Sequence, residues 1–322
     1  MKRKLLIIAL GGNALLQAGQ KGSIKEQREN IKKTLGSILP LIQEGYNLVL
    51  THGNGPQVGN VLLKNDAGEQ MYDIPAIPLD AAVADTQGEI GYLIQSELYN
   101  LLKENNLNRE IISVNTMVEV DKEDEAFQNP TKRVGKTYYD YNEVKKLQKE
   151  KAWIFKEEIK NNKKGWRRVV PSPQPLDIAN KNTIKLLADS GAIVIAVGGG
   201  GIPVSVEGGK IFPEEAVIDK DLASALLSQQ INADSFIILT DVPFVYLDYG
   251  TPEQKALEII DLEEVEKYMS EGKFGEGNMA PKIKAAKKFI ENGGKEVIIT
   301  NQEGISGGFG TRIVKQKEME KI

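Results

Sequence analysis

The chain has 322 residues, of which 41% are hydrophobic and 27% are charged, the proportions of an ordinary soluble globular protein. Its net charge of -4 and isoelectric point near 5.5 argue against a nucleic-acid partner. The chain has no cysteine and one histidine, His52, which excludes disulfides, thiolate sites and multi-histidine metal centres. The apolar run Leu5–Leu10 is too short for a signal peptide or a membrane span, so we expect a cytoplasmic protein with no membrane partner.

The first third of the chain alternates strand-like and helix-like segments. Ser23 and Glu26 have the spacing of a capping box, in which each side chain binds the other residue's backbone N–H, and they predict a helix start. Small residues between 81 and 91 repeat at helical spacing and indicate close packing, for which we consider a second subunit as the partner. In chain order we expect a strand at 5–10, a helix at 23–44, a strand at 46–51, a helix at 80–104 and a strand at 111–114.

Residues 121–168 differ in composition from the segments around them. They are rich in Lys, Glu, Asp and aromatic residues, including Trp153 and Trp166, and show no clear strand–helix alternation. The aromatic side chains favour burial in a folded unit over a disordered linker. We therefore predict a single domain over residues 1–322 that carries a small inserted subdomain at 121–168, with hinges near Val120 and Arg168.

The alternation resumes after this insertion. In chain order we expect a helix ending near 190, a strand at 192–197, a hairpin at 204–212, a helix beginning at Asp219, a strand at 235–239, a helix at 262–270, a glycine-containing loop at 272–280, a helix to 292 with Pro281 at its first position, a strand at 296–300 and a short last strand. This order predicts an α/β fold in which a mostly parallel sheet is covered by helices on both faces.

Four of the predicted strands end in glycine-rich or polar turns. In chain order these turns are Gly11-Gly12-Asn13, Gly53-Asn54-Gly55, Gly198 to Gly201, and Thr240-Asp241. Ligands of parallel α/β sheets bind beyond the carboxyl ends of the strands, so we expect the four turns to share one edge. Clustered glycines allow backbone N–H groups to approach a phosphate. The turns contain neither the Walker ending Lys-Ser/Thr nor the G-x-G-x-x-G fingerprint of dinucleotide-binding folds.

The triplet Asp219-Lys220-Asp221 is unusual for a helix start. Aspartates suit this position, but a lysine does not, because a helix N-terminus carries partial positive charge. A bound anion would explain Lys220, and the alternative is a solvated lysine beside two capping aspartates. Lys282, which follows Pro281, is likewise a lysine in the first turn of a predicted helix. Two such lysines near glycine-rich turns favour phosphoryl transfer, which needs charge neutralisation rather than a protein nucleophile, with an aspartate to hold the ammonium groups.

Several motifs together resemble the amino acid kinase superfamily, and within it the carbamate kinase family, over nearly the whole length. The motifs are Ala9-Leu-Gly-Gly-Asn-Ala-Leu15, Thr51-His-Gly-Asn-Gly-Pro-Gln-Val-Gly59, Gln87-Gly-Glu-Ile-Gly-Tyr92, Pro130-Thr-Lys132, Arg168-Val-Val-Pro-Ser-Pro173, Gly198-Gly-Gly-Gly-Ile-Pro203, Ile218-Asp-Lys-Asp-Leu-Ala223, Leu239-Thr-Asp-Val242 and Met279-Ala-Pro-Lys282.

The resemblance implies an open αβα sandwich with a protruding lid, a homodimer, and reversible phosphoryl transfer between ATP and carbamate. Mg²⁺ is then carried by the nucleotide, with no separate metal site in the protein. The implied catalytic residues are Lys220, Lys282, Asp221 and, from the lid, Lys132. The implied substrate and phosphate residues are Gly11, Gly12, Asn13, Gly53, Asn54 and Gly55, and the residues implied toward the nucleotide are Thr240, Asp241 and Met279.

The chain departs from the superfamily pattern at two places. Many members have a lysine just before the Gly-Gly pair, whereas this chain has Ala9-Leu10, as carbamate kinases do, so Lys220 or Lys132 must supply that charge. Ala280 stands where the family often has glycine. Two other functions remain open: another acyl-phosphate-forming kinase, and a nucleotide-binding regulator without catalysis. For His52 we favour a structural role, a hydrogen bond that shapes its loop.

Overall fold

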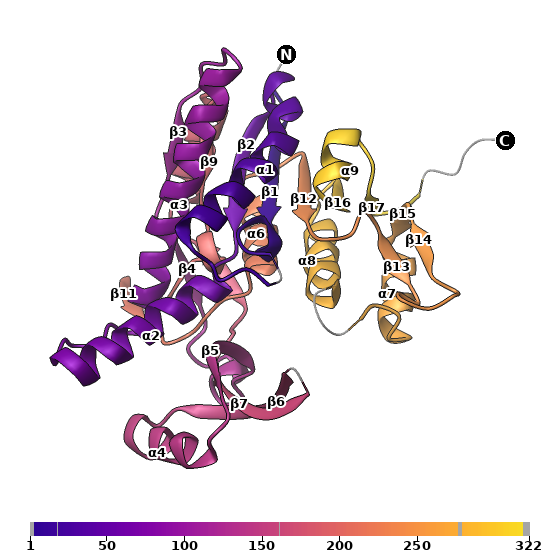
Figure 1. The fold of residues 1–322 in the computed structure, drawn as a ribbon. Helices are drawn as coiled ribbons and strands as arrows, with labels where there is room; N and C mark the ends of the chain where they lie inside the picture. The colour runs from indigo at the N-terminus through magenta and orange to yellow at the C-terminus, as the bar shows by residue number, and fades with distance from the viewer. Residues whose placement is uncertain (1–2, 18, 161, 276–278, 318–322) are drawn as a thin grey trace.

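An eight-stranded sheet forms the centre of the molecule, with helices on both of its faces (Figure 1). The computed structural model describes residues 3–17, 19–160, 162–275 and 279–317. Neighbouring strands of this sheet run parallel except for the antiparallel pair β16–β17. In sheet order the strands are β15 (Ile259–Asp261), β17 (Thr311–Val314), β16 (Glu296–Thr300), β12 (Ser235–Leu239), β1 (Leu5–Leu10), β2 (Asn47–His52), β9 (Ile193–Ile195) and β3 (Ile111–Ser113).

The central strand β1 is buried on both faces because alternate side chains point in opposite directions. Leu5, Ile7 and Ala9 join the core on the side of α5, α6 and α8, and the residues between them join the core on the side of α1 and α3. The bounds of these helices are α1 (Ile24–Gln43), α3 (Leu79–Glu104), α5 (Lys181–Asp189), α6 (Lys220–Gln230) and α8 (Met279–Glu291). The predicted sandwich around a mostly parallel sheet is therefore confirmed.

Smaller elements flank the central sheet. A four-stranded sheet contains, in order, β11 (Lys210–Pro213), β10 (Ile202–Glu207), β4 (Met117–Val120) and β8 (Pro175–Ile178), and β13 (Val245–Leu247) pairs with β14 (Lys255–Leu257). Three further α-helices belong to this body of the molecule: α2 (Gly55–Tyr72), α7 (Leu262–Ser270) and α9 (Gln302–Gly307). Short 3-10 turns lie at Gly12–Ala14, Glu125–Phe127 and Gly198–Gly200.

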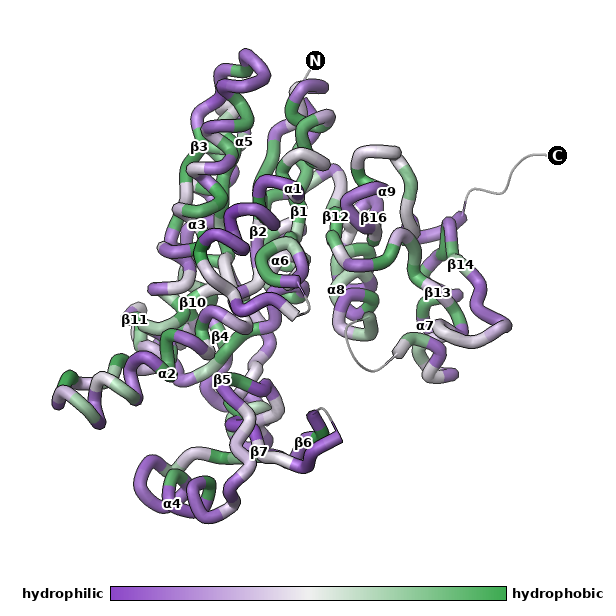
Figure 2. The backbone as a smooth tube through the Cα atoms, viewed as in Figure 1, coloured by the Kyte–Doolittle hydropathy of each residue, from purple (hydrophilic) through white to green (hydrophobic). Residues whose placement is uncertain are grey.

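Residues 132–170 project from this body as a three-stranded antiparallel sheet with one helix, which we call the lid (Figure 1). Its elements are β5 (Lys132–Tyr138), α4 (Tyr141–Lys151), β6 (Ile154–Lys160) and β7 (Lys163–Val170). The rings of Tyr138 and Phe155 pack edge to face with their centroids 5.4 Å apart, which gives the lid apolar packing of its own. Lys132 and Val170 pair with each other, so both ends of the lid meet the body at one stem. Figure 2 shows that α4 is largely hydrophilic, in contrast to the central strands.

The sequence prediction also lacks the short strands β4, β8, β13, β14 and β15, and it differs from the structure at two helices. The sequence does not predict α2, whose interior contains Gly59 and Gly68 and lacks a clear apolar stripe. Helix α8 begins at Met279, so Pro281 is its third residue rather than its first. Proline is tolerated there because N–H groups of the first helical turn have no partner within the helix. Residues 276–278 of the glycine-containing loop lie outside the described part of the chain.

Candidate active site

A cavity of about 1080 Å³ lies at the carboxyl ends of β12, β1, β2 and β9. These four strands are parallel neighbours, so the turns that follow them meet at one edge, as predicted. From the turn at 198–201, only Gly199 lines the cavity. The predicted site residues in its wall are Gly11, Gly12, Asn13, Gly53, Asn54, Gly55, Lys132, Lys220, Asp221, Thr240, Asp241 and Lys282. Met279 is not part of this wall and packs against the apolar core instead.

Lys220 and Lys282 come from the first turns of α6 and α8 and meet at Asp221. Nζ of Lys220 lies 2.5 Å from Oδ1 of Asp221, and Nζ of Lys282 lies 4.0 Å from Oδ2. The Lys220 side chain is only 14% exposed, so the alternative of a solvated lysine is wrong. Burial lowers the pKa of Lys282, the carboxylate of Asp221 opposes this effect, and the charge of Lys220 adds to it. The three charged side chains thus expose little of their surface, between 6% and 14% each.

Lys132 brings a third cation to the same wall from the lid. Its Nζ lies 3.0 Å from Oδ2 of Asp219, the residue that caps α6. The other carboxylate oxygen of Asp219 accepts hydrogen bonds from the N–H groups of Asp221 and Leu222. Burial alone would raise the pKa of Asp219, but the charge and hydrogen bond of Lys132, the charge of Lys220 and the hydrogen bond from the Leu222 N–H lower it below its ordinary value. Asp219 therefore links the start of α6 to the lid.

The glycine-rich turns bring backbone close to the cavity. A Cβ on Gly11 would lie 2.5 Å from the carbonyl oxygen of Leu239 at the end of β12, so only glycine fits this crossing. Helix α2 begins directly after Asn54, and the Asn54 side chain donates to Oγ1 of Thr86 at 2.9 Å instead of capping the helix. The first-turn N–H groups of α2 consequently border the cavity without a side-chain cap, an arrangement that suits an anionic group.

His52, at the end of β2, is buried, and burial lowers the pKa of its imidazole to about 4. Its Nδ1 lies 2.9 Å from the carbonyl oxygen of Gly53. Because a carbonyl oxygen only accepts hydrogen bonds, Nδ1 carries the proton. This contact orients the peptide of the Gly53 turn, which agrees with the structural role that we favoured for this histidine.

One part of the cavity, which the sequence prediction missed, is lined by residues of α1 and α9. Nε2 of Gln302 donates to Oγ1 of Thr34 at 2.8 Å across a separation of 268 residues, so no local pattern could reveal the contact. The other residues that line this part from the two helices are Lys33, Gly36, Ser37, Glu303 and Ser306. They give one end of the cavity a wall of hydroxyl, amide and charged groups.

Known proteins with similar sequences identify the family of this chain. The model of the amino acid kinase family matches residues 4–301. A carbamate kinase from Pyrococcus horikoshii is 50% identical over 312 residues, which cover 96% of this chain and 98% of the relative. The chain belongs to the carbamate kinases of the amino acid kinase family. No helix in the described part of this carbamate kinase family member is both long and apolar enough to cross a membrane.

Solved carbamate kinase structures share the whole architecture. Carbamate kinase from Giardia lamblia bound to AMP-PNP matches with a TM-score of 0.90 and 40% identity, covering 98% of this chain and 99% of that one. A second structure of the Giardia lamblia enzyme, thiocarbamoylated by disulfiram on a cysteine, matches with a TM-score of 0.87 and 39% identity, covering 98% and 100%. The fold of this carbamate kinase family member is thus the fold of its relatives over nearly the whole chain.

Proposed function

We propose that the protein transfers a phosphoryl group reversibly between ATP and carbamate, without a covalent enzyme intermediate. One observation carries this proposal: Lys220 and Lys282 share the buried Asp221 and face glycine-rich turns across one cavity. The arrangement offers positive charge and backbone donors. The chain has no cysteine, and its only histidine is buried with a low pKa, so the site suits direct transfer between two bound substrates.

Each group of residues has a distinct task in this proposal. Lys220 and Lys282 stabilise the charge that develops on the phosphoryl oxygens during transfer, and Asp221 holds both ammonium groups in place. Lys132 acts from the lid on the carbamate side. The turns Gly11-Gly12-Asn13 and Gly53-Asn54-Gly55 bind carbamate and the transferring phosphoryl group, and Thr240 and Asp241 lie toward the nucleotide.

We propose that the magnesium ion of the reaction enters this site with the nucleotide. Within the described residues, no group of three or more His, Cys, Asp or Glu side chains could hold a metal ion. Mg²⁺ usually binds one or two carboxylates together with substrate phosphates, and the exposed Asp241 in the cavity wall offers such a carboxylate. When bound, the ion would neutralise phosphate charge.

A coupled assay of ATP formation from ADP, carbamoyl phosphate and Mg²⁺ tests the proposed reaction. We expect turnover with carbamoyl phosphate, much less with acetyl phosphate as the control, and in the reverse direction none with N-acetylglutamate or aspartate. Turnover of either amino acid substrate at a rate comparable to that of carbamoyl phosphate would favour the other acyl-phosphate-forming kinases. A protein that binds ADP but turns over none of these substrates would be the regulator instead.

We also propose that the protein is a homodimer that uses the exposed face of α3. Tyr92 and Tyr99 are 61% and 58% exposed on this helix, and Gly88 is exposed at a position compatible with the same face. Ala82 and Gly91 of the small-residue stripe are buried within their own chain and do not serve a partner. Light scattering should give twice the chain mass of 35.5 kDa, and Tyr99→Lys should shift the mass toward the monomer.

A further inference from the structure

The lid contacts helix α2 at two separate places. Near the start of α2, Gly59 crosses β5 so closely that a Cβ on it would lie 3.1 Å from the backbone nitrogen of Gly135. Further along, Nζ of Lys151, the last residue of α4, lies 3.3 Å from Oδ1 of Asp66 and 2.5 Å from Oε2 of Glu69. An α-helix rises 1.5 Å per residue, so the two contacts are about 10–15 Å apart along α2. Two separated contacts resist a rotation of the lid that one contact would permit.

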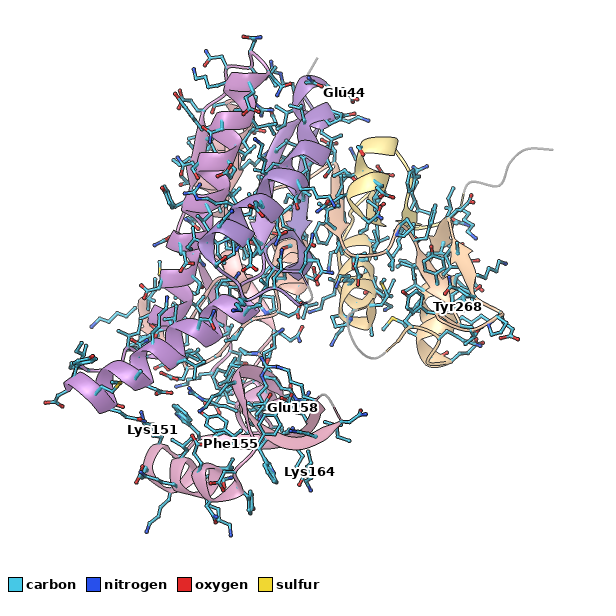
Figure 3. The ribbon with its side chains drawn as sticks, in the orientation of Figure 1. Glu44, Lys151, Phe155, Glu158, Lys164 and Tyr268 are labelled. Atoms are coloured by element: carbon cyan, nitrogen blue, oxygen red, sulfur yellow. The ribbon has the colours of Figure 1, made fainter. Side chains whose placement is uncertain are left out.

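The contact made by Lys151 is sheltered on several sides. The side chains of Lys151 and Asp66 are 26% and 21% exposed, whereas that of Glu69 is 43% exposed, so the pair with Asp66 is the more sheltered of the two. The ring of Trp153 lies 5.3 Å from the Lys151 ammonium and 4.1 Å from the guanidinium of Arg168. Figure 3 shows Lys151 in the space between α4 and α2. An ammonium group with two carboxylates and a ring as neighbours is held better than one in a single exposed ion pair.

The same two elements, α2 and the lid, also reach the candidate active site. Helix α2 begins at the Gly53–Gly55 turn, and β5 begins at Lys132, which lines the cavity and pairs with Asp219. At the stem, Val134 of β5 packs with Val58 of α2 in one small apolar cluster. A change in the angle between the lid and α2 would therefore move β5, whose first residue is Lys132.

We propose that Lys151 is a positioning residue that holds the lid, through Asp66 and Glu69, at the angle that places Lys132 in the cavity. The inference rests on the phosphoryl transfer proposed above and adds a contact outside the cavity that supports it. Lys151 is not part of the cavity wall, and its effect on the reaction passes through Lys132. A purely structural role would instead affect folding alone and would be independent of Lys132.

The kinetic test compares Lys151→Ala with Lys149→Ala, which removes an exposed lysine from the same last turn of α4. With carbamoyl phosphate and ADP, we expect Lys151→Ala to lower kcat by about three- to fivefold, the scale of one sheltered ion pair. Lys149→Ala should leave kcat unchanged. In a Lys132→Ala background, Lys151→Ala should have an effect of less than about twofold, because the group that it positions is already gone. Pairing Lys151→Glu with Glu69→Lys should restore part of the activity.

A second readout uses the two tryptophans of the chain, Trp153 and Trp166, which both lie in the lid. In a Trp166→Phe background, fluorescence reports on Trp153 alone, directly beside Lys151. Lys151→Ala should increase quenching of this fluorescence by acrylamide, and Lys149→Ala should not. This measurement needs no turnover, so it also tests the lid contact if the proposed function fails.

Three results would overturn the inference. The first is an equal loss of kcat from Lys151→Ala with and without Lys132, which would show independent effects. The second is an equal loss from Lys149→Ala, and the third is unchanged Trp153 quenching in Lys151→Ala. Absence of carbamoyl phosphate turnover in the wild-type protein would refute the proposed function, and the quenching result would then show whether Lys151 holds the lid to α2.

Discussion

Replacing Asp221 with asparagine removes the carboxylate that the buried Lys282 and the partly buried Lys220 share. At the 4.0 Å separation of Lys282 from Asp221, the attraction of opposite unit charges is about 4 kcal/mol at an effective dielectric constant of 20. Removing one partner of a buried ion pair destabilises a protein by about 3–5 kcal/mol, because the other charge stays buried. We therefore expect the free energy of unfolding of Asp221→Asn to fall by about 3 kcal/mol at pH 7, which lowers Tm by about 4 °C for a chain of 322 residues.

The stability that Asp221→Asn loses depends on pH through the pKa of Lys282. Burial already lowers the pKa of Lys282 below 10.5, and Asp221 opposes that shift, so the variant lowers the pKa further. Between the folded-state pKa and 10.5 the unfolded chain binds more protons at Lys282 than the folded chain, so stability rises with pH in that window. Because the variant widens the window, its stability deficit should shrink as pH increases. Its activity should also decline at a lower pH than that of the wild type, since Lys282 must keep its proton to stabilise phosphoryl oxygens.

Chemical denaturation at pH 7 and pH 9.5, together with pH profiles of kcat, measures both effects. Asp241→Asn is the control for stability, because Asp241 is an exposed carboxylate in the same cavity and its removal should change stability by less than about 0.5 kcal/mol. An Asp221→Asn variant with wild-type stability at pH 7 and an unchanged alkaline limb would refute the reasoning.

Three further predictions concern the same site and its surroundings. Lys220→Ala and Lys282→Ala should each lower kcat by about a hundredfold or more while the circular dichroism spectrum stays native. A near-wild-type kcat in both variants would exclude the two lysines from the reaction. Replacing residues 132–168 with a short Gly/Ser linker should leave a folded protein that binds ADP but transfers phosphoryl groups poorly. Lys132→Ala should reproduce part of that loss. A deletion variant that keeps most of its turnover would show that the lid is dispensable. Because the chain has no cysteine, mass spectrometry should find no thiocarbamoyl adduct after incubation with disulfiram, and a cysteine added at an exposed position should acquire one.

Local patterns in the sequence predicted much of the fold. The capping box of Ser23 and Glu26 is present at the start of α1, because both partners lie within one helical turn. The apolar run of β1 predicted a strand buried on both faces. Helix α2 was not predictable in this way. Its glycine at position 59 serves a crossing with β5 rather than the helix itself, so the local pattern points away from a helix.

The candidate site was predictable from lysines that occupy helix N-termini, where positive charge is unfavourable. Lysines at the starts of α6 and α8 are visible in the sequence, and the structure brings both to Asp221. The pair of Lys132 with Asp219 joins residues 87 positions apart, and no periodicity carries such information. The lid boundaries at 121–168 stay a prediction; the antiparallel strands themselves extend from 132 to 170.

The strand order of the central sheet has a consequence for how the chain is made. β1 pairs with β2 on one side, but its other neighbour, β12, ends only at Leu239. At a synthesis rate of about 5–20 residues per second, roughly 10–40 s pass between the appearance of β2 and that of β12. During this time one edge of β1, a strand of apolar residues only, has no native partner on the ribosome. We expect the nascent chain to depend on holding chaperones for that interval, and truncations before β12 to aggregate.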